Sequence, residues 1–111
     1  MLNDMTRLKN SGECAQILKA LGDETRLRMV RLLLQGELSV SDIVRQLDMA
    51  QPQVSHHLSI LRTAGLVETR REGNRIINFI DPEKALPKMK NSGIDLGCCS
   101  ISFDSDANPQ A

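Results

Sequence analysis

The stretch of sequence that decides the fold is SVSDIVRQLDMAQPQVSHHLSILRTAGL, residues 39–66. It opens with Ser39, which is followed three residues later by Asp42, and this is the spacing of a helix-capping box. Apolar residues then recur at helical spacing as far as Leu47. We therefore expect a short helix that begins beside Ser39.

A second helix is expected within the same stretch. Residues 48–50 make a tight connection, and Pro52 is tolerated only in the first turn of a helix, so this helix should begin at about Gln51. The Ala-Gly pair at residues 64–65 is a suitable end. The stretch thus predicts a helix, a three-residue turn and a second helix.

Two further helices are expected upstream. The first should run from about Glu13 to Leu21, because apolar side chains recur at i, i+3, i+4 and i+7 in Cys14, Ile17, Leu18 and Leu21. The next is capped by Asp23, starts at Glu24 and ends near Gln35.

After Leu66 the period changes from helical to extended. Residues 67–69 and 75–80 are β-prone runs, and residues 70–74 between them contain the Gly and Asn that a hairpin loop needs. This pattern predicts a two-stranded hairpin. The fold class is mainly α with a small β-hairpin, a winged helix-turn-helix.

The C-terminal part is expected to be less regular. A last helical stretch should start at residues 81–83, and Pro87 keeps it short. Residues 94–103 are expected as an irregular segment that docks as an extended strip, and residues 104–111 as a disordered polar tail.

Length and charge limit the functional classes. A chain of 111 residues has room for one compact domain. The formal net charge is zero, but residues 51–80 carry a net charge of +2 and residues 81–111 one of −2. No apolar run approaches the roughly 20 residues of a membrane-spanning helix, and the N-terminus lacks a secretory pattern. We expect a cytoplasmic protein with a local basic patch and no membrane partner.

The second helix of the central motif should present a polar face to double-stranded DNA. At the angular step of a helix, Val54, Leu58 and Leu61 lie within about 60° of one another and face the core. Polar side chains that can reach base edges and phosphates then point outward, namely Gln51, Gln53, Ser55, His56 and Ser59. We predict that these residues bind DNA.

Three arginines lie in or beside the predicted hairpin loop. An ordinary hairpin tip is simply solvated, but Arg70, Arg71 and Arg75 directly follow the helix-turn-helix, where they suit phosphates or the minor groove. We predict that all three bind DNA. The His56–His57 pair is not expected to bind metal, because neighbouring helical residues diverge by about 100° and no Cys or carboxylate lies at i+4. His57 should pack on the helix flank.

Several runs resemble the ArsR/SmtB family of bacterial repressors: LGDETRL at 21–27, QPQVSHHL at 51–58, LRTAGLV at 61–67 and RREGN at 70–74. The resemblance covers roughly residues 13–81. It implies a homodimeric winged-helix repressor whose first and last helices form the dimer interface and whose helix from Gln51 reads an inverted repeat. One departure is Ala50, where many relatives carry a capping Ser, so helix initiation should be slightly weaker.

This resemblance divides the chain into three parts. Residues 1–12 are a flexible N-terminal segment, residues 13–90 a DNA-binding and dimerisation domain, and residues 91–111 a cysteine-containing sensor segment with a polar tail. Two sensor sites known from relatives are missing. Where arsenic sensors often carry paired cysteines in the third helix, this chain has Ser39 and Ser41, and no histidine follows His57 to build the zinc-type site on the last helix.

Three cysteines remain, Cys14, Cys98 and Cys99. In a cytosolic chain they should be reduced rather than joined in a structural disulfide, and a bond between the neighbours Cys98 and Cys99 would close a strained ring. Because soft thiolates select soft ions, we predict that Cys98 and Cys99 chelate a trivalent arsenical, with Cys14 as the third ligand for inorganic arsenic. The alternatives are that Cys14 is a small buried apolar residue and that the tail pair is incidental.

The predicted function is a metalloid-responsive repressor that needs no cofactor and releases its operator when trivalent arsenic or a methylated arsenical binds. An alternative is a repressor of the same fold that responds to thiol oxidation or a persulfide, with Cys14 joined to a tail cysteine. A small thiol enzyme would need a cationic cradle near its cysteine, yet no arginine follows Arg75 and no lysine follows Lys90, so we expect no enzyme. A plain dimerisation module is the remaining possibility.

Overall fold

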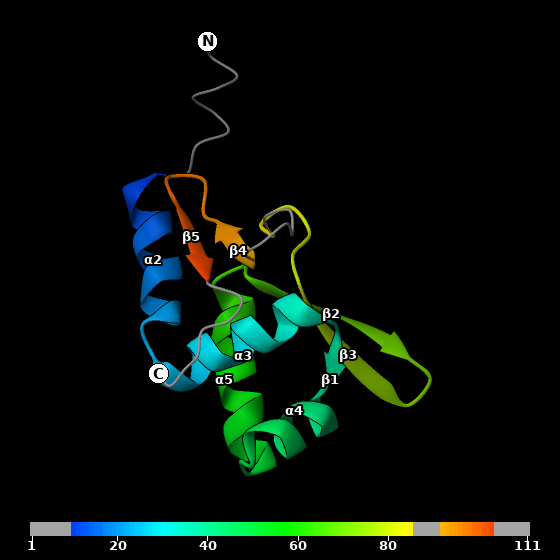
Figure 1. Cartoon of the computed structure of the whole chain (residues 1–111). Coiled ribbons are helices and arrows are strands. Elements are labelled where there is room, and N and C mark those ends of the chain that lie inside the picture. The colour runs from blue at the N-terminus through cyan, green and yellow to red at the C-terminus, as the bar shows by residue number, and fades with distance from the viewer. Residues whose placement is uncertain (1–9, 86–91, 104–111) are drawn as a thin grey trace.

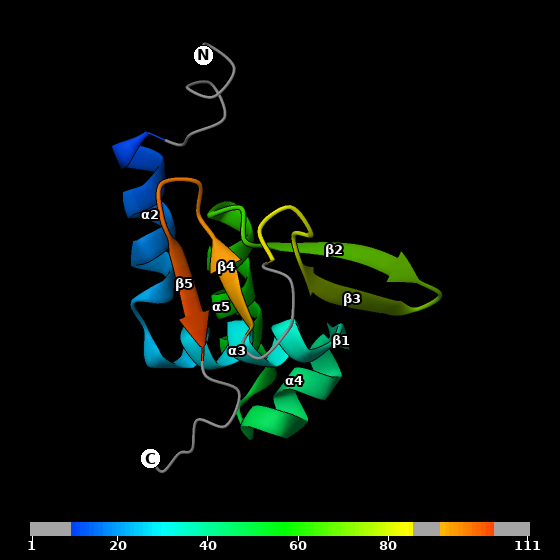
Figure 2. The same ribbon diagram turned by 45° about the horizontal axis from the view of Figure 1, so that its top comes forward.

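The computed structural model describes residues 10–85 and 92–103. Its helices and strands follow in chain order as α2 (Ser11–Leu21), α3 (Glu24–Gln35), β1 (Leu38–Ser39), α4 (Val40–Leu47), α5 (Gln51–Thr63), β2 (Val67–Glu72), β3 (Arg75–Ile80), β4 (Ser92–Asp95) and β5 (Ser100–Phe103). The helices pack together, the β2–β3 wing projects away from them, and the β4–β5 hairpin lies alongside α2 (Figures 1 and 2). None of the helices in the described ranges is long and apolar enough to cross a membrane.

Side-chain caps set the starts of the first two helices. α2 begins slightly earlier than expected, because the side chain of Asn10 accepts a hydrogen bond of 2.8 Å from the backbone N–H of Glu13. α3 begins after Asp23, whose carboxylate accepts from the backbone N–H of Arg26 at 3.0 Å. The predicted extent of α3 is confirmed.

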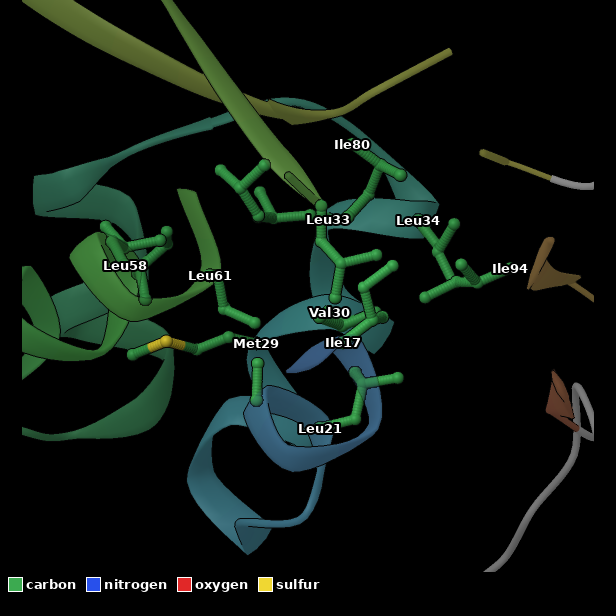
Figure 3. Packing of buried hydrophobic residues seen from close by; sticks show 14 of the residues in the cluster. Ile17, Leu21, Met29, Val30, Leu33, Leu34, Leu58, Leu61, Ile80 and Ile94 are labelled. Carbon is green, nitrogen blue, oxygen red and sulfur yellow. The ribbon is translucent and has the colours of Figure 1, made fainter. Parts of the chain in front are cut away.

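The core is aliphatic and receives side chains from the helices and from both sheets. Figure 3 shows part of this cluster, with Ile17, Leu21, Met29, Val30, Leu33, Leu34, Leu58, Leu61, Ile80 and Ile94 labelled. The expectation that Leu18 belongs to it is wrong, because this side chain is 44% exposed while Ala20 is buried in its place. Leu18 lies roughly 90° from the centre of the buried stripe of α2, at the edge of the apolar face.

The main sheet is larger than the predicted hairpin. Its strand order is β1-β3-β2, and the short strand β1 was not predicted. The predicted loop was also too long, because residues 70–72 continue the ladder up to the pair Glu72↔Arg75. Only Gly73 and Asn74 remain as the turn, and Gly73 takes a left-handed conformation with φ of 62°. The strands therefore extend almost to the tip of the wing.

The prediction of a last helix that starts at residues 81–83 is wrong for the residues that the structure describes. Residues 82–84 form a turn, and the chain returns at residue 92 as strand β4, which pairs with β5. The expected docking is confirmed, because Ile94 and Leu96 are fully buried, while the expected irregularity is not. Residues 96–99 join the strands, with a hydrogen bond of 2.8 Å from the backbone N–H of Leu96 to the Cys99 carbonyl oxygen and a φ of 93° at Gly97. Pro87 and the predicted polar tail lie outside the described residues.

Candidate nucleic-acid interface

The helix-turn-helix is built as the sequence predicts. At the start of α4, the backbone N–H of Asp42 donates to Ser39 Oγ and the backbone N–H of Ser39 donates to the Asp42 carboxylate, which completes the capping box. Asp48 ends α4 in the left-handed conformation with φ of 54°. Ala50 provides no side-chain cap for α5, as expected, and Pro52 lies in the first turn.

α5 separates an apolar face from a polar one. Val54, Leu58 and Leu61 are buried, as predicted. The five residues of α5 predicted to bind DNA are all exposed and occupy its first turns: Gln51, Gln53, Ser55, His56 and Ser59. The exposed side of this helix thus carries polar side chains that can form hydrogen bonds and that take no part in the core.

His57 lies on the flank of α5, as expected, with its side chain 19% exposed. Its Nδ1 is 3.1 Å from Nη1 of Arg26 and 4.0 Å from the carboxylate of Asp23. The hydrogen bond from the backbone N–H of Arg26 holds the pKa of Asp23 below its ordinary value. His57 is therefore engaged with the α2–α3 corner, whereas the neighbouring His56 faces solvent.

The wing arginines are not all free at the tip. Arg70 lies within β2 and forms ion pairs with Glu37 at 2.6 Å and with Glu72 at 2.7 Å, while its guanidinium sits over the ring of Phe79. The hydrogen bond from Arg70 lowers the pKa of Glu37 and raises that of Arg70 itself. This placement arises because the ladder runs further than the sequence indicates.

The other two arginines flank the turn. Arg75 Nη2 lies 3.1 Å from the carboxylate of Asp42 on α4. Arg71 is exposed and forms no ion pair within residues 10–85 and 92–103. Of the three predicted arginines, Arg71 is therefore the one whose charge is not already paired with a carboxylate of the described chain.

The cysteines meet at one place beside α2. Cys14 is buried on α2 and forms a disulfide with Cys98, with 6.5 Å between the two Cα atoms, which is an ordinary spacing for such a bond. Cys99 is free and exposed, and its Sγ lies 3.8 Å from that of Cys98. The expectation of three reduced thiols is thus wrong for this state of the protein. The turn at Gly97 brings Cys98 onto α2, which gives the pairing of Cys14 with a tail cysteine that the redox alternative requires.

The disulfide uses two of the three sulfurs predicted to bind arsenic. In the described ranges, no group of three or more His, Cys, Asp and Glu side chains is arranged as a metal site. The three-sulfur ligand set of Cys14, Cys98 and Cys99 therefore stays a prediction for the reduced protein.

A helix-turn-helix followed by a β-hairpin wing defines a winged helix-turn-helix DNA-binding domain. Residues 23–69 match the family model described as bacterial regulatory protein, arsR family. The chain belongs to this ArsR family, whose members are DNA-binding transcriptional regulators, and the prediction that it is not an enzyme is confirmed.

Three similar relatives show the range of the family. An uncharacterized HTH-type transcriptional regulator, MJ1325 of Methanocaldococcus jannaschii, is 47% identical over 79 residues, which are 70% of this chain and 89% of the relative. The biofilm growth-associated repressor of Agrobacterium fabrum is 42% identical over 77 residues, or 69% of this chain and 66% of the relative. The arsenical resistance operon repressor of Escherichia coli is 44% identical over 68 residues, or 60% and 58%. The matched region thus spans less than two thirds of the last two relatives, 66% of one and 58% of the other.

A solved structure confirms the fold. The homodimeric winged helix-turn-helix DNA-binding domain of Mb0332 from Mycobacterium bovis has a TM-score of 0.63 and 39% sequence identity. The match covers 65% of this chain and 67% of that one.

Proposed function

We propose that this chain is a transcriptional repressor that releases its operator when a trivalent arsenical binds its cysteine thiolates. The observation that carries the proposal is the meeting of three sulfurs from distant parts of the chain, Cys14 on α2 with Cys98 and Cys99 on the hairpin. After reduction they become three soft thiolates within reach of one ion. Inorganic trivalent arsenic takes three such ligands, and a methylated arsenical takes two.

The proposed DNA-binding surface combines the exposed face of α5 with the wing. The residues of α5 read base edges in the major groove, and the wing arginines contact the phosphates on either side. One recognition helix reads too few base pairs for useful specificity, so we infer a homodimer on an inverted repeat. The homodimeric relative from M. bovis supports this inference.

The dimer has a simple test. Leu18 is an exposed apolar side chain on α2, the helix that corresponds to the first dimer helix of the family. In sedimentation experiments we expect two chains per operator, and Leu18→Glu should shift the protein toward monomer. Tight binding of a single chain per operator would contradict the homodimer.

Effector binding is proposed to act through the position of the hairpin. The hairpin buries Ile94 and Leu96 in the core, so it cannot move without repacking the helices around it. An ion held between Cys14 and the Cys98–Cys99 pair fixes α2 and the hairpin at a new separation. If α2 lies in the dimer interface, this change alters the spacing of the two recognition helices, and affinity for the operator falls.

A second candidate trigger is thiol oxidation, and the Cys14–Cys98 disulfide specifically favours it. In this reaction two thiols lose two electrons and two protons to an oxidant such as hydrogen peroxide, which is reduced to two molecules of water. The disulfide then links α2 to the hairpin in place of the arsenical. Cys99 takes no part in that bond, which separates the two candidates experimentally.

Operator titrations on reduced protein decide between the triggers. Arsenite, methylarsenite and hydrogen peroxide are added separately to the wild type and to variants. The double variant Cys98→Ser/Cys99→Ser should bind operator normally and ignore both arsenicals, and Cys14→Ser should lose only the response to arsenite. Cys99→Ser is the matched control, because it keeps the disulfide pair but lacks the vicinal chelate. Release of the double variant by arsenicals would contradict the arsenical proposal, and a wild type that responds only to peroxide would establish the redox trigger.

A further inference from the structure

One side chain joins the cysteine-bearing helix to the recognition helix. Arg26, in the first turn of α3, donates from Nε to the carbonyl oxygen of Ala20 at 2.6 Å. Its Nη1 lies 3.1 Å from Nδ1 of His57 on α5. Because arginine has no acceptor, it must be the donor in both bonds, and His57 accepts with its proton on the other ring nitrogen. The guanidinium thus bridges α2 and α5.

The two ends of this bridge belong to the two functional regions. Ala20 lies six residues after Cys14 on the same helix, about 9 Å along its axis at the usual rise of 1.5 Å per residue. His57 is the neighbour of His56, one of the exposed residues predicted to read DNA. A rigid shift of α2 at its cysteine therefore reaches the Ala20 carbonyl and, through Arg26, the flank of α5.

Arg26 lies at a surface groove between the helices that it bridges. This groove of about 340 Å³ runs between α2 and α5, and Arg26 lines it. The other lining residues are Gln16, Lys19, Ala20, Ile60, Thr63 and Ala64.

We propose that Arg26 is the positioning residue that couples the state of the cysteines to the orientation of the recognition helix. This inference rests on the proposed function in taking the cysteines as the trigger. The planar guanidinium fixes the directions of its Nε and Nη1 donors relative to each other, toward acceptors on different sides. When α2 moves with the Ala20 carbonyl, either His57 follows or one of the two bonds breaks. Both outcomes give α5 different contacts in the two states, which is what coupling between two sites requires.

The first experiment compares operator affinity of the reduced and disulfide forms in the wild type, Arg26→Lys and Arg28→Lys. Lysine keeps the charge, but its single ammonium cannot replace two rigidly held donors that reach the Ala20 carbonyl oxygen and His57 Nδ1 at the same time. Arg28→Lys is the control on the same helix. In the wild type we expect a difference between the two forms of about 5- to 150-fold, the usual range for such coupling. In Arg26→Lys it should fall to within about twofold, and in Arg28→Lys it should stay as in the wild type.

A second measurement makes the bridge testable without DNA. The ¹⁵N resonances of the His57 ring report its hydrogen bond, and those of His56 serve as an internal control. Reduction of the disulfide should shift the His57 resonances in the wild type but not in Arg26→Lys. If reduction shifts the His57 resonances of the wild type but leaves its operator affinity unchanged, the bridge is supported and the cysteines are contradicted as the trigger of DNA release. His57 resonances that ignore the cysteine state, or full coupling retained in Arg26→Lys, would overturn the role of Arg26.

Discussion

The guanidinium of Arg75 in the wing and the carboxylate of Asp42 in the helix-turn-helix lie 3.1 Å apart. The same carboxylate closes the capping box with Ser39. One acidic side chain therefore starts α4 and also ties the wing to it. Arg70 and Glu37 make a similar link between β2 and the segment that precedes β1. Two ion pairs thus link the wing to the helix-turn-helix and the segment before it, in addition to the β1–β3 pairing.

The first prediction concerns acid stability. The pKa of Asp42 is lowered from its ordinary value of 3.8, chiefly by the hydrogen bond from the backbone N–H of Ser39 and also by Arg45. A lowered pKa contributes stability that is present above 3.8 and is lost as the pH falls through the lower value of the folded state. Asp42→Asn should therefore melt at a lower temperature than the wild type at neutral pH, and this gap should shrink in acid.

Thermal melts followed by circular dichroism at several pH values measure this gap. Glu68→Gln is the matched control, since Glu68 is a carboxylate of β2 without an ion pair in the described part of the chain. A gap that stays constant into strong acid would show that the carboxylate charge of Asp42 is not the cause.

The second prediction separates the wing from the recognition helix. Arg71→Ala should weaken binding to all DNA sequences and reduce the salt dependence by about one unit of slope for each phosphate that is no longer neutralised. Arg75→Ala should act in the same direction but more weakly, because Asp42 already pairs with Arg75. Gln53→Ala and His56→Ala should instead cost about 1–3 kcal/mol of preference for operator over random DNA. The measurement is anisotropy titration at several salt concentrations, with Lys19→Ala on α2 as the charge control. Unchanged salt slopes in both wing variants would contradict the assignment.

The third prediction concerns the start of the recognition helix. Ala50 is the N-cap of α5 and makes no side-chain hydrogen bond to it. Pro52 has no N–H, and the backbone N–H of Gln53 already donates to the Ala50 carbonyl oxygen at 3.1 Å, so an Ala50→Ser hydroxyl can only share the Gln53 donor. The free energy of unfolding should therefore rise by only about 0.5 kcal/mol, the low end for an N-cap. Urea denaturation measures the change, and Ser39→Ala, which removes the working cap of α4, should lower it by about 1 kcal/mol. An unstable Ala50→Ser variant would mean that this backbone cannot use a cap.

The helices α2 to α5 and the exposed polar face of α5 could be predicted because their signals are local. The capping box of Ser39 and Asp42, the position of Pro52 and the spacing of Val54, Leu58 and Leu61 all lie within a few turns of the elements they define. Helical geometry then assigns each side chain to a face without any knowledge of its tertiary neighbours.

The features that were missed depend on contacts between distant segments. Cys14 and Cys98 are 84 residues apart, so the sequence offered a bond between Cys14 and a tail cysteine only as an alternative, and it did not predict the β4–β5 pairing that positions Cys98. Arg70 pairs with Glu37, which lies 33 residues earlier in the chain. The sequence therefore predicted an unpaired arginine at a position where the fold supplies a carboxylate partner. Strand β1 is two residues long, too short for any periodicity to reveal it.

The last prediction tests whether the hairpin belongs to the core of the domain. Leu96 is fully buried, yet it is the first residue of the 96–99 connection that carries Cys98 and Cys99. If the hairpin packs as part of the core, Leu96→Ala should lower the free energy of unfolding by about 2–5 kcal/mol, as for other buried leucines. Ser102→Ala, at an exposed position of β5, is the control and should change it by less than about 0.5 kcal/mol. Urea unfolding of the reduced proteins measures this packing without the contribution of the disulfide. If Leu96→Ala lowers stability only in the oxidised form, the disulfide alone holds the hairpin on the domain. Effector binding at the cysteines could then not reach α5 through the packing of the hairpin in the core.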